Sequence, residues 1–385
     1  MKGFALENEL ERLKQQGLYR SRRVIDSPQD VSIRIDGRPV LNFCSNDYLG
    51  LARHPQVISA FQQAANHYGI GSGSAHLICG HSVAHHTLEE ELATFTKRDR
   101  ALLFSTGYMA NLGVLSALLG RGDDVFEDKL NHASLLDGGL FSGATFKRYL
   151  HADVDSLQKK LNRSTAAKKI LVTDGVFSMD GDLAPLVDLA SLAKKNEAAL
   201  MVDDAHGLGV LGQTGGGLVE QCELTQTDVP ILMGTFGKAF GTSGAFVAGS
   251  EALIETLIQK SRPYIYTTAL PAAIAAATST SLNLLINDSW RREKLQALIM
   301  QFKQGANQLG LRLMNSNSAI QPILVGDAQK AVAISQHLLD LGILVTAIRP
   351  PTVAKGQARL RVTFSANHQK KNVTSLLNAL EKSIL

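Results

Sequence analysis

Short apolar runs alternate with helix-length segments through the middle of this 385-residue chain. The runs lie at residues 101–104, 124–127, 145–149, 169–173, 199–202, 231–234 and 245–248. Strands that are separated by helix-length connections must cross over, and such crossovers produce a mostly parallel sheet with helices on both faces. We therefore predict an α/β fold built on a central sheet between residues 100 and 250.

A different pattern precedes this region. Apolar residues follow helical spacing over residues 4–18, and a later alternating run contains Asp36-Gly37, which is a strong signal for a β-hairpin. We expect residues 1–50 to form an N-terminal arm made of a helix and a hairpin. The large α/β domain then spans residues 51–285.

The pattern changes again toward the C-terminus. Two helical segments precede three strand-like pieces, at residues 271–286 and 289–309 for the helices and 320–325, 343–348 and 358–364 for the strands. Helices combined with a few short strands predict a smaller α+β domain over residues 286–385.

Composition excludes several classes of protein. The 39 Lys and Arg against 35 Asp and Glu give a net charge of +4 without a block of like charge, so no nucleic-acid partner is expected. The three cysteines, Cys44, Cys79 and Cys222, are widely spaced and indicate reduced thiols. Neither a signal peptide nor an apolar stretch long enough to span a membrane is recognisable, so we expect a cytoplasmic protein without a membrane partner.

One lysine stands in a glycine-rich turn directly after an apolar run. Residues 229–233 read VPILM, and Lys238 follows in the stretch TFGKAFG. A strand that ends near residue 234 places Lys238 at the carboxyl edge of the sheet, where open α/β sheets bind ligands. A desolvated lysine loses its proton readily and can form a Schiff base with a carbonyl compound. Such a turn more often carries a surface lysine, so this interpretation depends on two further motifs.

The first of these motifs is an acid at the end of another apolar run. Residues 199–202 are followed by Asp203, and His206 lies three positions further on. A carboxylate at a strand end can hold a protonated ring nitrogen, as a pyridoxal phosphate (PLP) cofactor requires, because a pyridinium withdraws electrons from a carbanion. His206 would then reach the hydroxyl group of the ring. The alternative is a strand-terminal turn that is capped by the aspartate.

The second motif is a strand, a Ser-Thr-Gly turn and a helix start over residues 103–111. Free backbone N–H groups at a helix start favour a phosphate. Strand, turn and helix are common in α/β proteins. The combination of a phosphate-binding turn, an acid and a histidine for the pyridine ring, and a lysine that forms a Schiff base is specific. In chain order, its parts are Gly107-Tyr108, Asp203-x-x-His206 and Thr235-x-x-Lys238.

Four longer stretches resemble the α-oxoamine synthase family of fold-type I PLP enzymes. They read NFCSNDYLG at residues 42–50, NHAS at 131–134, VFSMDGD at 176–182 and IRPPTV at 348–353. The resemblance covers the chain from Arg20 to beyond Arg361. It implies a PLP-transferase-like fold of type I, with a mostly parallel central sheet flanked by helices and a smaller α+β C-terminal domain.

The resemblance also implies roles for individual residues. In the catalytic set, Lys238 carries PLP, Asp203 pairs with the pyridine nitrogen and His132 stacks on the ring. The other implied cofactor-binding residues are Gly107, Tyr108 and Thr235 at the phosphate, and Ser178 and His206 at the ring oxygen. The implied substrate-binding residues are Asn46 and Arg361 at the amino-acid carboxylate, Arg20 and Thr352 at the acyl entrance, and His132.

At several positions the residues alone leave alternatives open. His132 could cap a helix, and Ser178 could simply form a turn. Arg359 and Arg361 point the same way on one alternating strand, and we expect one of them to face solvent. The choice of Arg361 rests on the resemblance. Three neighbouring arginines compete for the acyl entrance: Arg20, Arg22 and Arg23.

The activity implied by the resemblance is the decarboxylative condensation of an amino acid with an acyl thioester. The stretches, above all residues 348–353, are most similar to family members of biotin biosynthesis, which use L-alanine and pimeloyl-CoA or a pimeloyl-acyl-carrier protein. The alternatives are a synthase that uses glycine or serine with another acyl-CoA, such as a 2-amino-3-ketobutyrate CoA ligase, and a PLP aminotransferase. Fold-type I enzymes build their sites between two subunits, so a homodimer is expected.

No metal site is expected from the sequence. The histidines His81, His85 and His86 are interpreted as structural or surface residues on a helix near the glycine-rich loop at residues 69–74. That loop follows a helix-like run rather than a strand, so it is not a dinucleotide-binding fingerprint.

Overall fold

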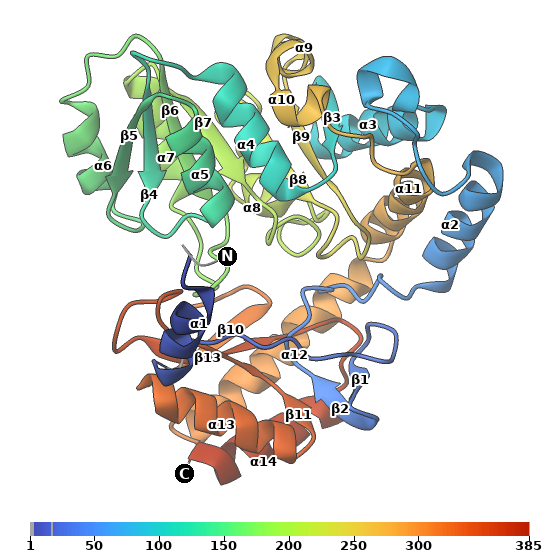
Figure 1. Ribbon diagram of the computed structural model, residues 1–385, viewed down its shortest axis with the longest axis vertical. Helices are drawn as coiled ribbons and strands as arrows, with labels where there is room; N and C mark the ends of the chain where they lie inside the picture. The colour runs from blue at the N-terminus through green and yellow to red at the C-terminus, as the bar shows by residue number, and fades with distance from the viewer. Residues whose placement is uncertain (1–3, 17, 385) are drawn as a thin grey trace.

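The computed structural model describes residues 4–16 and 18–384, and a seven-stranded sheet lies in the upper half of the molecule as drawn in Figure 1. The strands are β3 (Arg100–Phe104), β4 (Asp124–Asp128), β5 (Thr145–Tyr149), β6 (Lys169–Asp174), β7 (Ala199–Asp203), β8 (Ile231–Thr235) and β9 (Ala245–Gly249). Their order across the sheet is β3-β9-β8-β7-β6-β4-β5, and among them only β9 runs antiparallel to its neighbours. The mostly parallel sheet is confirmed, and every predicted apolar run forms a strand.

Helices cover both faces of this sheet because side chains alternate along each strand. In β7, Leu200 and Val202 pack into one apolar core, and Met201 packs into the other. The first core includes side chains of α3 (Val83–Thr96), α6 (Val154–Leu161), α7 (Leu186–Lys195) and α8 (Gly217–Gln221). The second includes those of α4 (Gly107–Leu118), α5 (Ala133–Phe141), α9 (Glu251–Lys260) and α10 (Arg262–Ile265). Burial on both faces explains why the strands read as continuous apolar runs.

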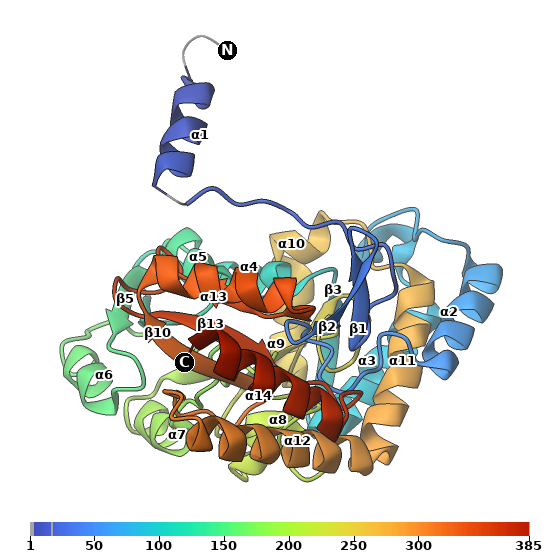
Figure 2. The same cartoon turned by 90° about the horizontal axis from the view of Figure 1, so that it is seen from below.

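The N-terminal arm contains the predicted hairpin. Strands β1 (Ser32–Ile35) and β2 (Arg38–Asn42) pair antiparallel across Asp36 and Gly37, which have φ angles of 49° and 74°. Positive φ at both positions is what a two-residue hairpin turn requires. Helix α1 (Leu6–Gln15) stands away from the rest of the chain and buries none of its residues (Figure 2). The chain then enters α2 (Pro55–Tyr68) before the glycine-rich loop.

The C-terminal part combines four strands with long helices. These elements are α11 (Ala272–Asn287), α12 (Ser289–Gln308), β10 (Ile320–Gly326), α13 (Ala328–Asp340), β11 (Ile343–Leu344), β12 (Thr346–Ile348), β13 (Ala358–Thr363) and α14 (Lys370–Ile384). The single strand predicted over residues 343–348 is wrong, because β11 pairs with β2 whereas β12 pairs with β13. No described helix, α12 included, is long and apolar enough to cross a membrane.

The division into an arm (1–50), a large domain (51–285) and a smaller domain (286–385) remains a prediction. Positions 1–3 and 17 of the predicted arm and position 385 of the predicted smaller domain lie outside the described residues.

Candidate active site

A cavity of about 200 Å³ lies at the carboxyl ends of β6, β7 and β8. Asp174, Asp203 and Thr235 are the last residues of these three strands, and all three line it. Every residue predicted to bind the cofactor is found in its wall: Gly107, Tyr108, His132, Ser178, Asp203, His206, Thr235 and Lys238. The fold therefore brings these dispersed sequence motifs into one place.

Lys238 follows β8 in a loop that aromatic rings anchor. Phe236 and Phe240 on either side of it are fully buried, and their ring centroids lie 5.4 Å apart. Gly241 has a φ of 66°, and a Cβ there would lie 2.3 Å from the backbone nitrogen of Ala52, so the close approach requires glycine. Burial lowers the pKa of Lys238 to about 8, although the nearby Asp203 opposes this shift. The amine is therefore partly free of its proton near neutral pH.

The carboxylate of Asp203 is held by two donors of the chain. The side-chain amide of Asn111 donates to Oδ2 at 2.7 Å, and the backbone N–H of Ala205 donates to Oδ1 at 3.1 Å. The neighbouring Asp174 has its pKa raised well above the usual value, first by burial and then by the charge of Asp203. This shift favours the protonated form of Asp174.

His206 is buried and belongs to a chain of polar contacts. The hydroxyl group of Tyr48 lies 2.6 Å from Nδ1 of His206 and 3.2 Å from Oδ1 of Asn46. Burial, followed by the charge of Lys238, lowers the pKa of His206 well below its usual value, so the ring is neutral. Tyr48 therefore fixes the orientation of a neutral imidazole in the cavity wall.

Replacement of Tyr48 by phenylalanine tests this positioning. Tyr48→Phe leaves buried polar atoms of His206 and Asn46 without this partner, and the free energy of unfolding should fall by about 1–3 kcal/mol. Urea denaturation followed by circular dichroism measures the change. The control is Tyr68→Phe on the surface of α2, which should change stability by no more than about 0.5 kcal/mol. Equal stability of the two variants would show that the contacts of the Tyr48 hydroxyl do not contribute to the free energy of unfolding.

His132 both caps a helix and lines the cavity. It is the N-cap residue of α5, and its Nδ1 lies 2.7 Å from the hydroxyl of Ser134. Its backbone N–H donates to Oδ2 of Asp174 at 2.7 Å. The capping alternative is therefore confirmed, and it is compatible with a ring that faces the cavity. Burial lowers the pKa of His132, which favours an uncharged ring.

The start of α4 in the cavity wall offers backbone donors to an anion. Gly107 and Tyr108 begin α4, so their N–H groups have no partner within the helix. A Cβ on Gly107 would lie 2.9 Å from the Cε of Met233, and glycine keeps this approach open. The hydroxyl of Thr235 lies beside this end and donates to the carbonyl of Gly244 at 3.0 Å.

Two of the predicted substrate residues lie beside the cavity. Arg361 donates through Nε to the carbonyl of Ser178 at 2.6 Å and lies 3.4 Å from Oδ1 of Asn46. Ser178 itself lies in a turn, as its alternative interpretation predicts. The expectation that Arg359 or Arg361 faces solvent is wrong: both are buried, because Arg359 pairs with Asp180 inside the protein.

The other two predicted substrate residues are not brought to the cavity. Arg20 lies in an extended, exposed segment together with Arg22 and Arg23, and Thr352 lies in an exposed loop between β12 and β13. Neither residue is among those that line the cavity. The role of these two residues at the entrance for the acyl substrate therefore stays a prediction.

Several residues that line the cavity or hold its side chains were not predicted, among them Asp174, Asn111 and Tyr48. Asp174 follows the apolar run 169–173 as Asp203 follows its own run, so the sequence held a signal for it. Asn111 and Tyr48 had no comparable signal, because their partners Asp203 and His206 are far away in the chain.

The donor set of the cavity fits PLP. A lysine with a lowered pKa suits its carbonyl carbon, a buried and oriented carboxylate suits its protonated ring nitrogen, and a helix start suits its phosphate. The three groups lie around one cavity, which is the arrangement that a single bound cofactor needs.

Comparisons with known proteins agree with this assignment. The family model for aminotransferase class I and II matches residues 38–380. An 8-amino-7-oxononanoate synthase of Saccharophagus degradans is 62% identical over 97% of this chain and 95% of its own length. The solved 8-amino-7-oxononanoate synthase of Francisella tularensis is 33% identical, with a TM-score of 0.79 over 90% of this chain and 98% of that one.

A third comparison adds the cofactor. A solved serine palmitoyltransferase variant from S. paucimobilis, with bound PLP and myriocin, is 32% identical and has a TM-score of 0.93 over 99% of this chain and 97% of that one. These likenesses confirm the fold-type I architecture. The chain therefore belongs to the aminotransferase class I and II family and, within it, to the 8-amino-7-oxononanoate synthases, which are PLP-dependent acyltransferases.

Proposed function

We propose that this chain joins L-alanine to a pimeloyl thioester, carried by CoA or by an acyl-carrier protein, and releases 8-amino-7-oxononanoate, carbon dioxide and the free thiol. The relatives' shared name supports the product. The observation that carries the proposal is Lys238, a lysine with its pKa lowered to about 8 in the same cavity as Asp203 and His132. A binding protein without catalysis would need none of these three groups.

Some residues of the cavity would hold the cofactor, and Lys238 would also transfer a proton. PLP, when bound, supplies an electron sink for the charge that develops on the α-carbon of the amino acid. Nζ of Lys238 would hold the cofactor and, once released, take the α-proton, for which a pKa near the working pH is optimal. Asp203 would keep the ring nitrogen protonated, and its own bonds from Asn111 and Ala205 hold it in place.

His132 and His206 would position the ring of the cofactor. Burial lowers the pKa of both imidazoles, which favours their uncharged forms and limits the positive charge near Lys238. Gly107, Tyr108 and Thr235 would bind the phosphate, and Ser178 would lie near the ring oxygen. The family resemblance implies these roles, and the presence of all these residues in one cavity wall supports them.

Arg361 and Asn46 would bind the carboxylate of the amino acid. Arg361→Lys keeps the positive charge but loses the two-pronged guanidinium, so KM for L-alanine should rise about 10-fold or more, with a smaller change in kcat. Steady-state kinetics with varied L-alanine measures both constants. Arg34→Lys, on the exposed edge of β1, is the matched control and should behave as the wild type. An unchanged KM in Arg361→Lys would remove Arg361 from the substrate site.

For the acyl substrate, we propose that Arg20 and Thr352 line the entrance in a homodimer. Large apolar side chains near the glycine-rich loop, Ile70 and Ile78, are 85% and 78% exposed in the single chain, which supports burial against a second copy. We also propose a cytoplasmic location, consistent with three cysteines that form no disulfide.

Product identification tests the proposed substrates. Holoprotein receives pimeloyl-CoA, or a pimeloyl-acyl-carrier protein, with equal amounts of L-alanine, glycine and L-serine, and the products are analysed by mass spectrometry. The mass of 8-amino-7-oxononanoate should dominate. A dominant glycine or serine product would overturn the choice of L-alanine, and accumulation of pyridoxamine phosphate without a condensation product would favour the aminotransferase alternative.

A further inference from the structure

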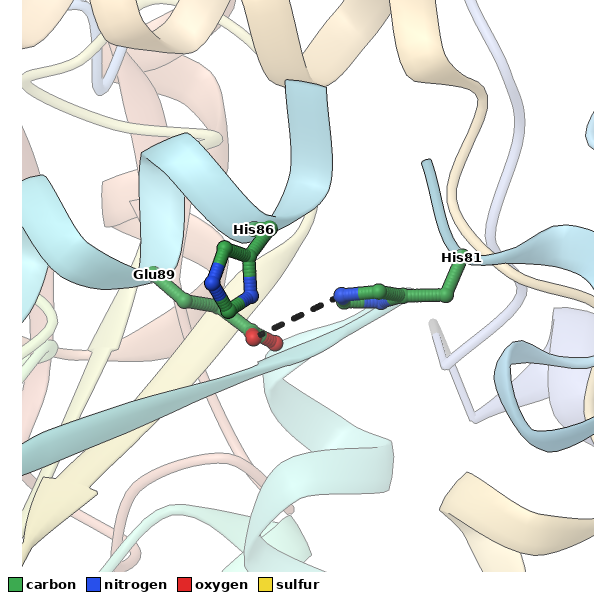
Figure 3. A group of neighbouring side chains, drawn as sticks. All are labelled: His81, His86 and Glu89. Atoms are coloured by element: carbon green, nitrogen blue, oxygen red, sulfur yellow. Dashed lines mark ion pairs between the residues drawn. The ribbon is translucent and has the colours of Figure 1, made fainter. Parts of the chain in front are cut away.

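A second group of chemically active side chains lies outside this cavity, at the start of α3. A short π-helix, η1 (His76–Gly80), ends immediately before His81, and α3 begins two residues later. His86 and Glu89 are three positions apart on α3 and therefore lie on the same side of the helix. Figure 3 shows the His81 ring directed toward the Glu89 carboxylate, with the His86 ring close to both. His81 thus precedes the helix on which the sequence had placed it.

We propose that His81, His86 and Glu89 form a binding site for a zinc-class divalent cation. One ligand atom from each residue lies within 4.8 Å of the others, and Nε2 of His81 lies 4.0 Å from Oε2 of Glu89. Ligands of a tetrahedral zinc ion at about 2.0–2.1 Å are roughly 3.3 Å apart, so small rotations of these side chains close the site. This proposal does not rest on the proposed reaction at the other cavity.

Neighbouring groups already orient two of the three ligands. The backbone N–H of Leu103 donates to Oε1 of Glu89 at 3.0 Å, and this leaves Oε2 for a cation. Nδ1 of His81 lies 3.0 Å from Nδ1 of His76, and this leaves Nε2 of His81 for a cation. The ring of His76 stacks on Tyr264 with centroids 5.0 Å apart. Outer partners that fix ligand orientation in this way are typical of zinc sites.

The types of ligand in this site determine which cation it should prefer. Two imidazoles and one carboxylate, with water completing the coordination, suit zinc and related transition metals, whereas calcium and magnesium prefer oxygen ligands. The guanidinium group of Arg100, which lies near the site, pairs with Glu251 at 2.6 Å and with Glu255 at 2.5 Å. These two carboxylates therefore compensate the positive charge of Arg100. Glu89 is the partly buried carboxylate of the site, with a side chain that is 12% exposed.

In the other histidine and acid cluster of the described chain, both ring nitrogens of the histidine already have carboxylate partners. Nδ1 of His151 lies 3.0 Å from Asp128, and its Nε2 lies 2.8 Å from Asp182. The third member of that group, Asp180, pairs with Arg359. These contacts make it a structural ion-pair network, and they leave the α3 cluster as the candidate for a metal.

Zinc titration of the PLP-loaded protein, in competition with a chromogenic chelator, tests the site. We expect one zinc ion per chain, and we expect His81→Gln and Glu89→Gln each to weaken binding by more than about 10-fold, since loss of an outer partner alone typically costs that much. Glu89→Gln keeps an oxygen for the Leu103 N–H, so its fold should be retained. Zinc should also raise the Tm of the wild type and leave that of the two variants unchanged.

Matched controls separate this site from adventitious binding. Glu90→Gln removes the next carboxylate along α3, which lies 3.5 Å from His86, and His337→Gln removes an exposed histidine of α13. Both controls should bind zinc as the wild type does. Binding that is equally strong in His81→Gln and Glu89→Gln, or no binding by the wild type, would overturn the proposal.

Discussion

Lys238→Ala should abolish product formation: we expect kcat to fall by at least about 10⁴-fold, since proton transfer by a positioned side chain alone contributes 10²–10⁴-fold and the covalent hold on the cofactor is lost as well. The physical reason is the environment of Nζ. Burial lowers the pKa of Lys238 to about 8, so a free amine is available that an exposed lysine would not offer. Product formation measured by mass spectrometry gives the residual rate.

The control for this variant is Lys260→Ala, which removes an exposed lysine from α9. It should retain wild-type turnover, and circular dichroism should show that both variants are folded. Removal of Lys238 leaves the anchoring rings of Phe236 and Phe240 in place, so the loop should persist. Appreciable product from folded Lys238→Ala would remove this lysine from the chemistry.

Asp203→Asn should lower kcat by about 10²–10³-fold, a loss comparable to that of one preorganised electrostatic partner in an active site. The substitution preserves shape, but a neutral amide cannot stabilise the charge of a protonated ring nitrogen. The absorption spectrum of the bound cofactor should change together with kcat, because the ring loses its counter-charge. A purely structural role of Asp203 would leave that spectrum unchanged.

The neighbouring residue provides a strict control. Asp204 is also fully buried, but burial raises its pKa to about 8, so it is mostly protonated at neutral pH and resembles asparagine. Its Oδ2 accepts the N–H of Leu218 at 2.6 Å, away from the residues that line the cavity. Asp204→Asn should therefore keep nearly full activity. Equal losses in Asp203→Asn and Asp204→Asn would contradict the specific role of Asp203.

The central sheet was predictable because its strands are buried on both faces. Each strand then reads as a continuous apolar run, and the acids and the lysine that follow these runs meet at one edge. The strand predicted over residues 343–348 failed because its two halves pair with β2 and β13, strands that lie far away in sequence. Local patterns do not encode such a change of partner.

Side-chain partnerships across the chain were the least predictable part of the site. Arg359 is buried because Asp180 neutralises it, and no period of two in β13 reveals that pairing. The Tyr48 and His206 contact joins residues that are 158 positions apart. His81 approaches Glu89 only because the chain turns between η1 and α3. In each case the fold had to be known before the contact could be inferred.

Borohydride reduction of the holoprotein, followed by peptide mass spectrometry, is the most direct test of a PLP enzyme centred on Lys238. Reduction makes the bond between the cofactor and its lysine permanent, so the modified peptide identifies that lysine. We predict a single PLP adduct, on the peptide that contains Lys238. An adduct on another lysine, or the absence of any adduct in protein saturated with PLP, would contradict the assignment of this cavity as the active site.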